Sequence, residues 1–172
     1  MKRLPDSIQK EYVPLIKDLV GILKKQFADN LLSAVLYGSV ARGQANKGSD
    51  IDICLIFRSL PDATHRRTAY VTAFENELRI KKSFSRLFDD GYYVSVSPVE
   101  FTADELKLRT PVLFLDMIER GIVLIDDGTF EKKVEQLKRR MADLGTHKVT
   151  LEDGTHTWLL KKDARPGEAI AL

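Results

Sequence analysis

The chain has 172 residues, of which 44% are hydrophobic and 30% are charged. These proportions exclude a disordered chain and suit one well-buried domain with a small appendage. A formal net charge of +2 indicates no strong field, so nucleic acid is not indicated as a partner. One cysteine excludes an internal disulfide, and no apolar run is long enough to span a membrane. We expect a cytoplasmic protein with no membrane partner.

The first segment has the pattern of a helix. Apolar residues recur at the spacing of one helical face up to Phe27, and Asp6 is placed to cap the start. Pro14 falls inside the pattern, and a proline removes one hydrogen bond from a helix. We therefore expect a helix over residues 6–27 that is kinked at Pro14, or two shorter helices, lying on a sheet.

A short apolar run at residues 31–36 follows and has the pattern of a strand that is covered on both faces, which places it in the middle of a sheet. At its end, Gly38 would let the backbone approach a ligand closely. Ser39 would cap a short helix over residues 40–42 and offer its hydroxyl group to a phosphate. The sequence therefore predicts an anion site at this turn.

A second strand is predicted to begin at the acidic residues. Because side chains alternate along a strand, Asp50 and Asp52 share one face, and the apolar residues between and beyond them turn the other face toward the core. Two carboxylates held side by side on a half-buried strand repel each other, so a divalent cation is their natural partner. Oxygen ligands beside a phosphate site favour Mg²⁺.

The rest of the chain predicts alternating elements. We expect a helix over residues 63–82, a loop over 83–91, a strand over 92–96 and a helix opened by a capping box of Thr102 and Glu105. A second helix after Pro111 should end before Gly121, and a strand follows at 122–125. A turn at 126–128 then divides a core, residues 1–127, from an appendage, residues 128–172, made of a helix over 130–144 and a hairpin with arms 147–151 and 156–160. The predicted fold class is α/β (α+β), a small mixed sheet with helices packed on it.

The segment GSVARGQANKGSDID, residues 38–52 with the following Ile53, resembles the signature of the DNA polymerase beta-type nucleotidyltransferase superfamily. It is most similar to the minimal nucleotidyltransferases of prokaryotes. The resemblance implies a polymerase beta-like core in which Asp50 and Asp52 are catalytic and bind Mg²⁺, while Gly38 and Ser39 hold the β- and γ-phosphates. Arg42 either adds a positive charge there or caps its loop. The implied donor is ATP, or another nucleoside triphosphate, and the implied transferred group is AMP.

The superfamily usually carries a third acid on the strand predicted at 92–96, where it helps to activate the attacking hydroxyl. This chain has serines there, including Ser95 and Ser97. The nearest carboxylates are Asp90 upstream and Glu100 downstream. We predict Glu100 as the third catalytic residue, because Pro98 can bend the end of the strand back toward the two aspartates.

Three functions fit the resemblance. The first is an adenylyltransferase that modifies a partner protein, as minimal nucleotidyltransferases do when they act as antitoxins on a HEPN-type toxin. The second is a transferase that acts on a small molecule, as antibiotic nucleotidyltransferases do. The third is a nucleotide-binding protein without catalysis, which the missing third acid favours. We expect the first of these.

Overall fold

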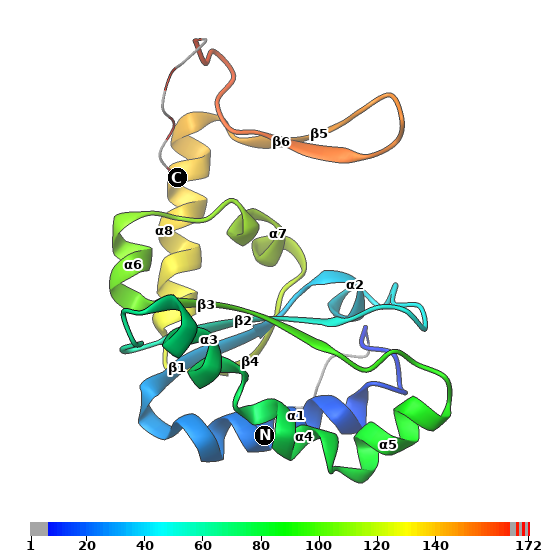
Figure 1. The fold of residues 1–172 in the computed structure, drawn as a ribbon. Helices are drawn as coiled ribbons and strands as arrows, with labels where there is room; N and C mark the ends of the chain where they lie inside the picture. The colour runs from blue at the N-terminus through cyan, green and yellow to red at the C-terminus, as the bar shows by residue number, and fades with distance from the viewer. Residues whose placement is uncertain (1–6, 166–167, 169, 171) are drawn as a thin grey trace.

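A four-stranded mixed sheet forms the middle of the protein (Figure 1). The computed structural model describes residues 7–165, 168, 170 and 172. The strands run in the order β3-β2-β1-β4, and their bounds are β1 (Leu31–Leu36), β2 (Ile51–Phe57), β3 (Val96–Thr102) and β4 (Ile122–Asp126). Strand β1 is antiparallel to β2 and β4, whereas β2 and β3 are parallel. This architecture confirms the predicted fold class.

The two inner strands carry the core on both of their faces. Every residue of β1 is buried, which confirms its predicted place in mid-sheet. The odd-numbered residues of β2, from Ile51 to Phe57, join one apolar cluster. Cys54 and Ile56 join a second cluster on the opposite face. The face that carries Asp52 is therefore solvent-accessible only near the start of the strand.

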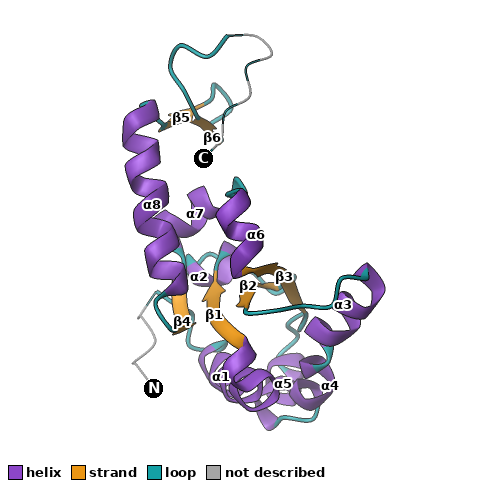
Figure 2. Cartoon of the chain, turned by 90° about the vertical axis from the view of Figure 1, so that its left-hand side faces the viewer, coloured by secondary structure: helices purple, strands orange, loops and turns teal. Residues whose placement is uncertain are grey.

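Helices before β3 pack against the first cluster, and Figures 1 and 2 show them on one side of the sheet. They are α1 (Val13–Phe27), the 3-10 turn η1 (Ala28–Asn30), α3 (Thr64–Thr72), α4 (Phe74–Arg79) and α5 (Lys82–Asp89). The kink predicted at Pro14 is wrong: Pro14 lies in the first turn of α1, where a helix has no hydrogen bond to lose. The predicted cap, Asp6, lies outside the described residues.

Three further predictions fail in the segment between β2 and β3. The helix predicted over residues 63–82 is divided into α3 and α4, and the loop predicted over 83–91 is largely the helix α5, which buries Leu87. The strand predicted at 92–96 begins only at Val96. Tyr92 packs edge-on against Tyr12 of the α1 side, with ring centroids 5.6 Å apart, and does not join the sheet. Pro98 is tolerated in β3 because β3 is an edge strand.

Later helices cover the opposite face of the sheet (Figure 2). They are α6 (Ala103–Leu108), α7 (Leu113–Arg120) and α8 (Thr129–Leu144). The capping box of Thr102 and Glu105 is confirmed, and so is the end of α7 before Gly121. Phe130 and Leu137 of α8 are buried in the same cluster as α7. The division predicted at residue 127 stays a prediction.

A two-stranded hairpin follows α8, as predicted. Its strands are β5 (His147–Thr150) and β6 (His156–Leu159), which are antiparallel. Trp158 fixes the hairpin to α7, because its Nε1 donates a hydrogen bond to Asp116 Oδ1 at 3.1 Å. Lys148 Nζ makes a second contact, to Glu119 Oε2 at 2.6 Å. The hairpin is thus held against the end of α7.

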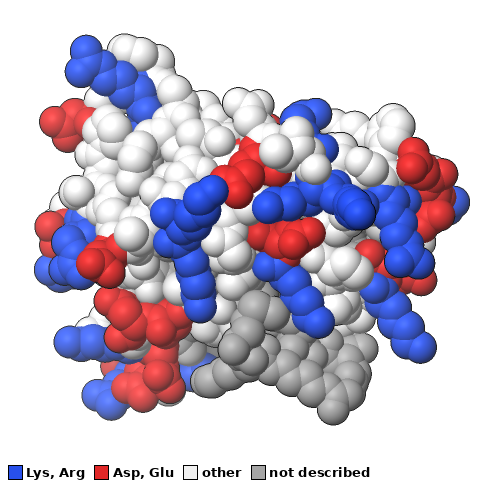
Figure 3. Space-filling view, turned by 90° about the horizontal axis from the view of Figure 1, so that it is seen from below, with Lys and Arg blue, Asp and Glu red and all other residues white. Residues whose placement is uncertain are grey.

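The surface around α1, α4 and α5 mixes charges of both signs. Figure 3, which views the molecule from this side, shows basic side chains scattered among acidic ones. Lys25 and Lys81 both pair with Glu77. The basic residues of α1 and α4 therefore belong to an ordinary solvated surface. Among the residues that the structure describes, none of the helices has the length and apolar character needed to cross a membrane.

One ion cluster ties α3 to β3 and α6. Both terminal nitrogens of Arg67 donate to the carboxylate of Glu105 at 2.8 Å, and Arg67 Nε lies 3.4 Å from Glu100 Oε1. The hydrogen bond from Arg67, together with those from Thr102, lowers the pKa of Glu105 from 4.5 to about 2. Because the charged form is favoured in the folded state, this contribution to stability is complete above pH 4.5 and is lost as the pH falls toward 2.

We predict that Glu105→Gln lowers the free energy of unfolding by about 1 kcal/mol at pH 7, a value reduced for the partial exposure of the pair. The difference from wild type should disappear between pH 4.5 and pH 2, when Glu105 of the wild type becomes protonated. Urea unfolding at several pH values measures this. Asp104→Asn, in the same helix but in an exposed pair with Lys107, is the control and should change stability by less than about 0.5 kcal/mol.

Candidate active site

The turn after β1 packs directly on an aspartate of β2. Gly38 opens the short helix α2 (Gly38–Ala41) with a φ of +70°, which glycine adopts without strain. A Cβ atom at this position would lie 1.9 Å from Asp52 Oδ2. Tyr37 N donates to the carbonyl oxygen of Asp52 at 3.0 Å and fixes the same approach. Only glycine therefore allows the turn and the carboxylate to meet.

Ser39 lies inside α2. The prediction that it caps a helix over 40–42 is wrong, because the helix begins two residues earlier, at Gly38, and Tyr37 is its N-cap. The carbonyl oxygen of Ser39 accepts from Gln44 N at 2.9 Å. Its hydroxyl group has no partner among the described residues and remains available to a ligand, as do the first N–H groups of the helix, which have no partner within it.

Asp50 and Asp52 lie at the start of β2, and Ser97 of β3 lies beside them. Ser97 is the register partner of Asp52, so the two side chains share a face. Ser97 Oγ donates a hydrogen bond to Asp50 Oδ2 at 2.5 Å. Ser97 therefore stands on the neighbouring strand at the place where the superfamily pattern led us to look for a third acid.

Electrostatics at this cluster are dominated by negative charge. Burial raises the pKa of Asp52, the neighbouring charge of Asp50 raises it further, and Arg42 acts in the opposite direction. Burial, followed by the negative charge of Asp52, raises the pKa of Tyr37 to about 12. The folded chain thus holds a half-buried carboxylate in an environment that disfavours its charge, and a cation would relieve this cost.

Arg42 follows α2 as its C-cap residue. Its Nε donates to Gln44 Oε1 at 3.2 Å, which is a contact within its own loop. Its charge also acts on Asp52. Both alternatives left open by the sequence, a positive charge at the site and a brace for the loop, therefore have a basis in the geometry.

The structure does not bring Glu100 to the two aspartates. Glu100 is the register partner of Leu55, three positions along β2 from Asp52, and its side chain belongs to the other face of the sheet, where it pairs with Arg67. Asp90, the alternative candidate, is the C-cap of α5, and its carbonyl oxygen accepts from Lys47 Nζ at 2.6 Å. The sequence predicted a start for β3 that lies four residues too early. The predicted alternation of side chains between the two faces of the sheet was correct. The bend expected at Pro98 is absent, because β3 stays paired with β2 up to Thr102.

The loop that joins α2 to β2 is held by the start of the chain. Gln9 Nε2 donates to the carbonyl oxygen of Ala45 at 3.0 Å, and the hydroxyl of Tyr12 donates to the carbonyl oxygen of Asn46 at 3.3 Å. Within the loop, Ser49 Oγ accepts from Asn46 N at 3.0 Å. These contacts set where the chain enters β2, and hence where Asp50 lies.

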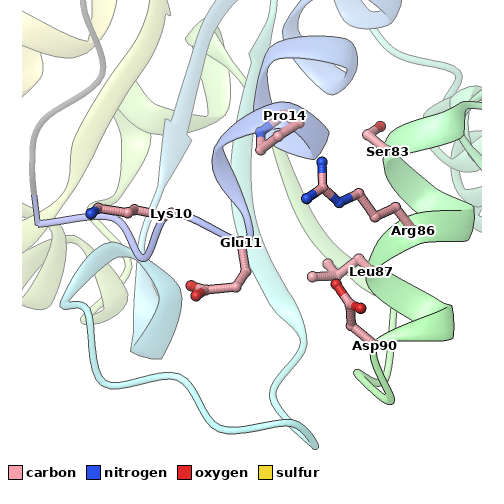
Figure 4. A pocket seen from close by; sticks show the side chains of 7 residues that line it. All are labelled: Lys10, Glu11, Pro14, Ser83, Arg86, Leu87 and Asp90. Atoms are coloured by element: carbon pink, nitrogen blue, oxygen red, sulfur yellow. The ribbon is translucent and has the colours of Figure 1, made fainter.

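Two cavities lie near this part of the molecule. One, of about 420 Å³, shares Arg42 with the aspartate site and is lined further by residues of α7 and the hairpin; its lining is Arg42, Gln44, Asp116, Glu119, Arg120, Lys148 and His156. The other, of about 200 Å³, lies between the segment that leads into α1 and the helix α5 (Figure 4). It shares no residue with the aspartates or with α2. The first is therefore the cavity that belongs to the site.

The carboxylate oxygens of Asp50 and Asp52 suit a cation that also binds phosphate oxygens. Within the described residues, no group of three or more His, Cys, Asp or Glu side chains is gathered to hold a metal ion. Asp50 and Asp52 offer two hard carboxylates beside an anion-binding turn. Such a pair fits Mg²⁺, which is commonly bound by one or two carboxylates together with substrate phosphates and water.

Comparison with known proteins decides the family. A family model described as a nucleotidyltransferase domain matches residues 16–153, which is most of the chain and includes the turn, both aspartates and β5. The chain belongs to the nucleotidyltransferase domain family. Members of this family generally use divalent metal ions, in agreement with the donor set. The resemblance read from the signature segment is confirmed.

Three relatives illustrate the likeness. "Putative protein adenylyltransferase MJ1305" of Methanocaldococcus jannaschii is 26% identical over 126 residues, which cover 72% of this chain and 79% of that protein. A toxin-antitoxin crystal structure with AMP-PNP gives a TM-score of 0.48 at 17% identity, covering 76% of this chain and 92% of that one. A tri-AMPylated Shewanella oneidensis HEPN toxin in complex with its MNT antitoxin gives 0.45 at 15%, covering 77% and 92%. At these scores the family assignment rests on the sequence match.

We predict that Asp52→Asn makes this nucleotidyltransferase more stable at pH 7 in the absence of ligands. The raised pKa of Asp52 means that its charge costs stability at pH values above the folded pKa, and that this cost is lost as the pH falls below the usual Asp value. The midpoint of thermal unfolding should rise by roughly 2 °C or more at pH 7 and by nothing near pH 3. Asp62→Asn, at an exposed carboxylate without contacts among the described residues, is the control, and an equal gain in both variants would contradict the proposed cause.

Proposed function

We propose that this nucleotidyltransferase transfers AMP from ATP to a hydroxyl group of a partner protein, with Mg²⁺ bound by Asp50 and Asp52. The observation that carries the proposal is the contact between Gly38 and the carboxylate of Asp52. It joins an anion-binding turn to a pair of repelling carboxylates in a chain of the nucleotidyltransferase family. The phosphates of a nucleoside triphosphate would bind at the turn, and a divalent cation bound to those phosphates would neutralise the two carboxylates.

In this proposal the residues of the chain position the substrates and stabilise the negative charge of the phosphates. Nucleotidyl transfer forms a bond between the acceptor oxygen and the α-phosphorus, releases the proton of the acceptor hydroxyl to solvent, and breaks the bond to the bridging oxygen, which leaves with pyrophosphate. When bound, Mg²⁺ neutralises charge on the phosphates and helps to hold the attacking and leaving oxygens in line. The Ser39 hydroxyl and the N–H groups at the start of α2 donate to the β- and γ-phosphates, and Arg42 adds a positive charge on the same side.

Ser97 takes a supporting role here. By donating to Asp50 Oδ2 it holds that carboxylate in one orientation beside Asp52, and it is thus a positioning residue. The proposal gives Glu100 a structural role, because its charge is used in the cluster with Arg67 and it belongs to the opposite face of the sheet.

A protein acceptor is favoured over a small molecule. The relative of which 79% of the length matches this chain is named "Putative protein adenylyltransferase MJ1305". The signature segment is most similar to minimal nucleotidyltransferases, whose acceptors are HEPN-type toxins, commonly at a tyrosine. Antibiotic nucleotidyltransferases usually devote a larger second domain to their acceptor, whereas only α8 and one hairpin follow β4 in the described part of this chain.

The decisive experiment supplies ATP labelled at the α-phosphate to the purified protein with Mg²⁺ and a cell lysate, or with a HEPN-type protein encoded beside it. We expect the label on a protein band, and we expect the double variant Asp50→Asn/Asp52→Asn to abolish it. Isothermal titration should show that the double variant also loses most of the Mg²⁺-dependent affinity for ATP, while Asp62→Asn keeps both activities. Label on an aminoglycoside but not on protein would establish the small-molecule reading. Binding of ATP without transfer to any acceptor would establish the binding-protein reading.

The roles of Ser97 and Glu100 are separable. Ser97→Ala removes a hydrogen bond to a charged group, which corresponds to about 1.5–3 kcal/mol, so we predict a fall in transfer of tenfold or more with ATP saturating. Glu100→Gln weakens the cluster with Arg67 and should lower thermal stability while leaving the transfer rate within about twofold of wild type. Single-turnover rates measure both, and loss of transfer in a stably folded Glu100→Gln protein would restore Glu100 as a catalytic residue.

A further inference from the structure

One cavity adjoins the end of α2, because Arg42, the C-cap residue of that helix, lines it. Arg42 lines it and at the same time acts electrostatically on Asp52. Its remaining walls come from Gln44, from the last turns of α7 and from the hairpin. A ligand held at the aspartates and the α2 turn can therefore extend into this space without leaving the protein surface.

Arg120, the last residue of α7, is brought to this cavity by the pairing of β1 with β4. The antiparallel register ends at the pair Leu36 and Ile122, so the second residues beyond the pair, Gly38 after β1 and Arg120 before β4, flank the same end of the sheet. Gly121 makes the junction tight. A Cβ atom there would lie 2.5 Å from the carbonyl oxygen of Met117 and 3.1 Å from Val35 Cγ1. The backbone of Arg120 is thus fixed beside the phosphate turn.

The positive charge of this residue is not used within the described part of the chain. Arg120 makes no ion pair there, and the one side-chain hydrogen bond that Arg42 donates within the described residues goes to the neutral side chain of Gln44. The two carboxylates of the cavity are already engaged by the hairpin: Asp116 accepts from Trp158 Nε1, and Glu119 pairs with Lys148 at 2.6 Å. Two guanidinium groups are therefore left facing a polar cavity of about 420 Å³.

We propose that Arg120, together with Arg42, binds the terminal phosphates of the nucleotide and the pyrophosphate that leaves. This inference rests on the proposed function and adds a binding residue to it. A guanidinium group presents planar, paired N–H donors that match two phosphate oxygens, which suits it to this position better than a lysine. As the bond between the α-phosphorus and the bridging oxygen breaks, the electron pair stays on that oxygen, and the departing pyrophosphate gains negative charge. Arg120, in the wall of the cavity, stabilises this charge.

The hairpin of β5 and β6 engages the two acidic side chains of the cavity. If Asp116 and Glu119 were unengaged, their charges would oppose a phosphate in the same cavity. Lys148 and Trp158 hold them instead, and the Lys148 Nζ also lies 5.4 Å from the centre of the Trp158 ring. Lys148 thus neutralises Glu119, and the lining as a whole has three basic residues against two acidic ones, a balance that favours an anion.

Isothermal titration of Arg120→Gln with Mg²⁺-ATP and with AMP tests the inference. AMP lacks the terminal phosphates, so we expect at least tenfold weaker binding of ATP and unchanged binding of AMP. Arg120→Lys should recover only part of the affinity for ATP, because the paired donors are lost. Arg109→Gln is the matched control, since Arg109 is the exposed C-cap of α6, outside the cavity, and it should bind both nucleotides as wild type does.

Inorganic pyrophosphate separates failure of this inference from failure of the proposed function. Wild-type binding of ATP that is equally strong in Arg120→Gln would overturn the role of Arg120 and leave the proposed function standing. Absence of ATP binding in wild type, with pyrophosphate binding that depends on Arg120, would support the anion site and reject the proposed function. If wild type bound neither ATP nor pyrophosphate, both would be rejected. Thermal unfolding of each variant shows whether a loss of binding reflects a loss of folding.

Discussion

The contact between the backbone of Gly38 and the carboxylate of Asp52 is the constraint on which the site depends. A hydrogen atom at Cα is all that fits between the turn and the acid. This contact sets the distance between the groups that would hold phosphate and those that would hold a cation. It also contributes to burying Asp52, whose raised pKa records the cost of keeping a charge there. The sheet supplies the rigidity, because β1 and β2 are its two inner strands.

Strong local patterns made the central part of the fold predictable. The apolar run of β1, the alternation along β2, the capping box at Thr102 and the hairpin pattern of residues 147–160 each specify a local conformation by themselves. The signature segment placed the candidate site residues Gly38, Ser39, Asp50 and Asp52 within fifteen residues of sequence, and the fold brings Gly38 against Asp52. The sequence could not predict the close packing of Gly38 on Asp52 or the hydrogen bond from Ser97 to Asp50. Both contacts join segments that meet only in the folded chain.

Failures of prediction came where tertiary contacts override local preference. The amphipathic α5 was taken for a loop because its few apolar residues, such as Leu87, acquire a partner only when α1 lies beside them. Tyr92 alternates like a strand residue but packs against Tyr12. Glu100 was assigned to the aspartates on the strength of a bend at Pro98, and the parallel ladder with β2 continues straight past that proline. The contribution of Arg120 has no local signal, since only the pairing of β1 with β4 brings it to the turn.

The hydrogen bonds from Gln9 and Tyr12 to the loop before β2 tie the beginning of the described chain to the segment that leads into Asp50. The segment in front of α1 is therefore a brace for that loop as well as a lead-in to a helix. Fusion partners and affinity tags are commonly attached at this end of a protein. For this protein an attachment at the opposite end, beyond the hairpin, leaves that brace undisturbed, and a shortened version that begins inside α1 would release residues 45–46 from their anchors.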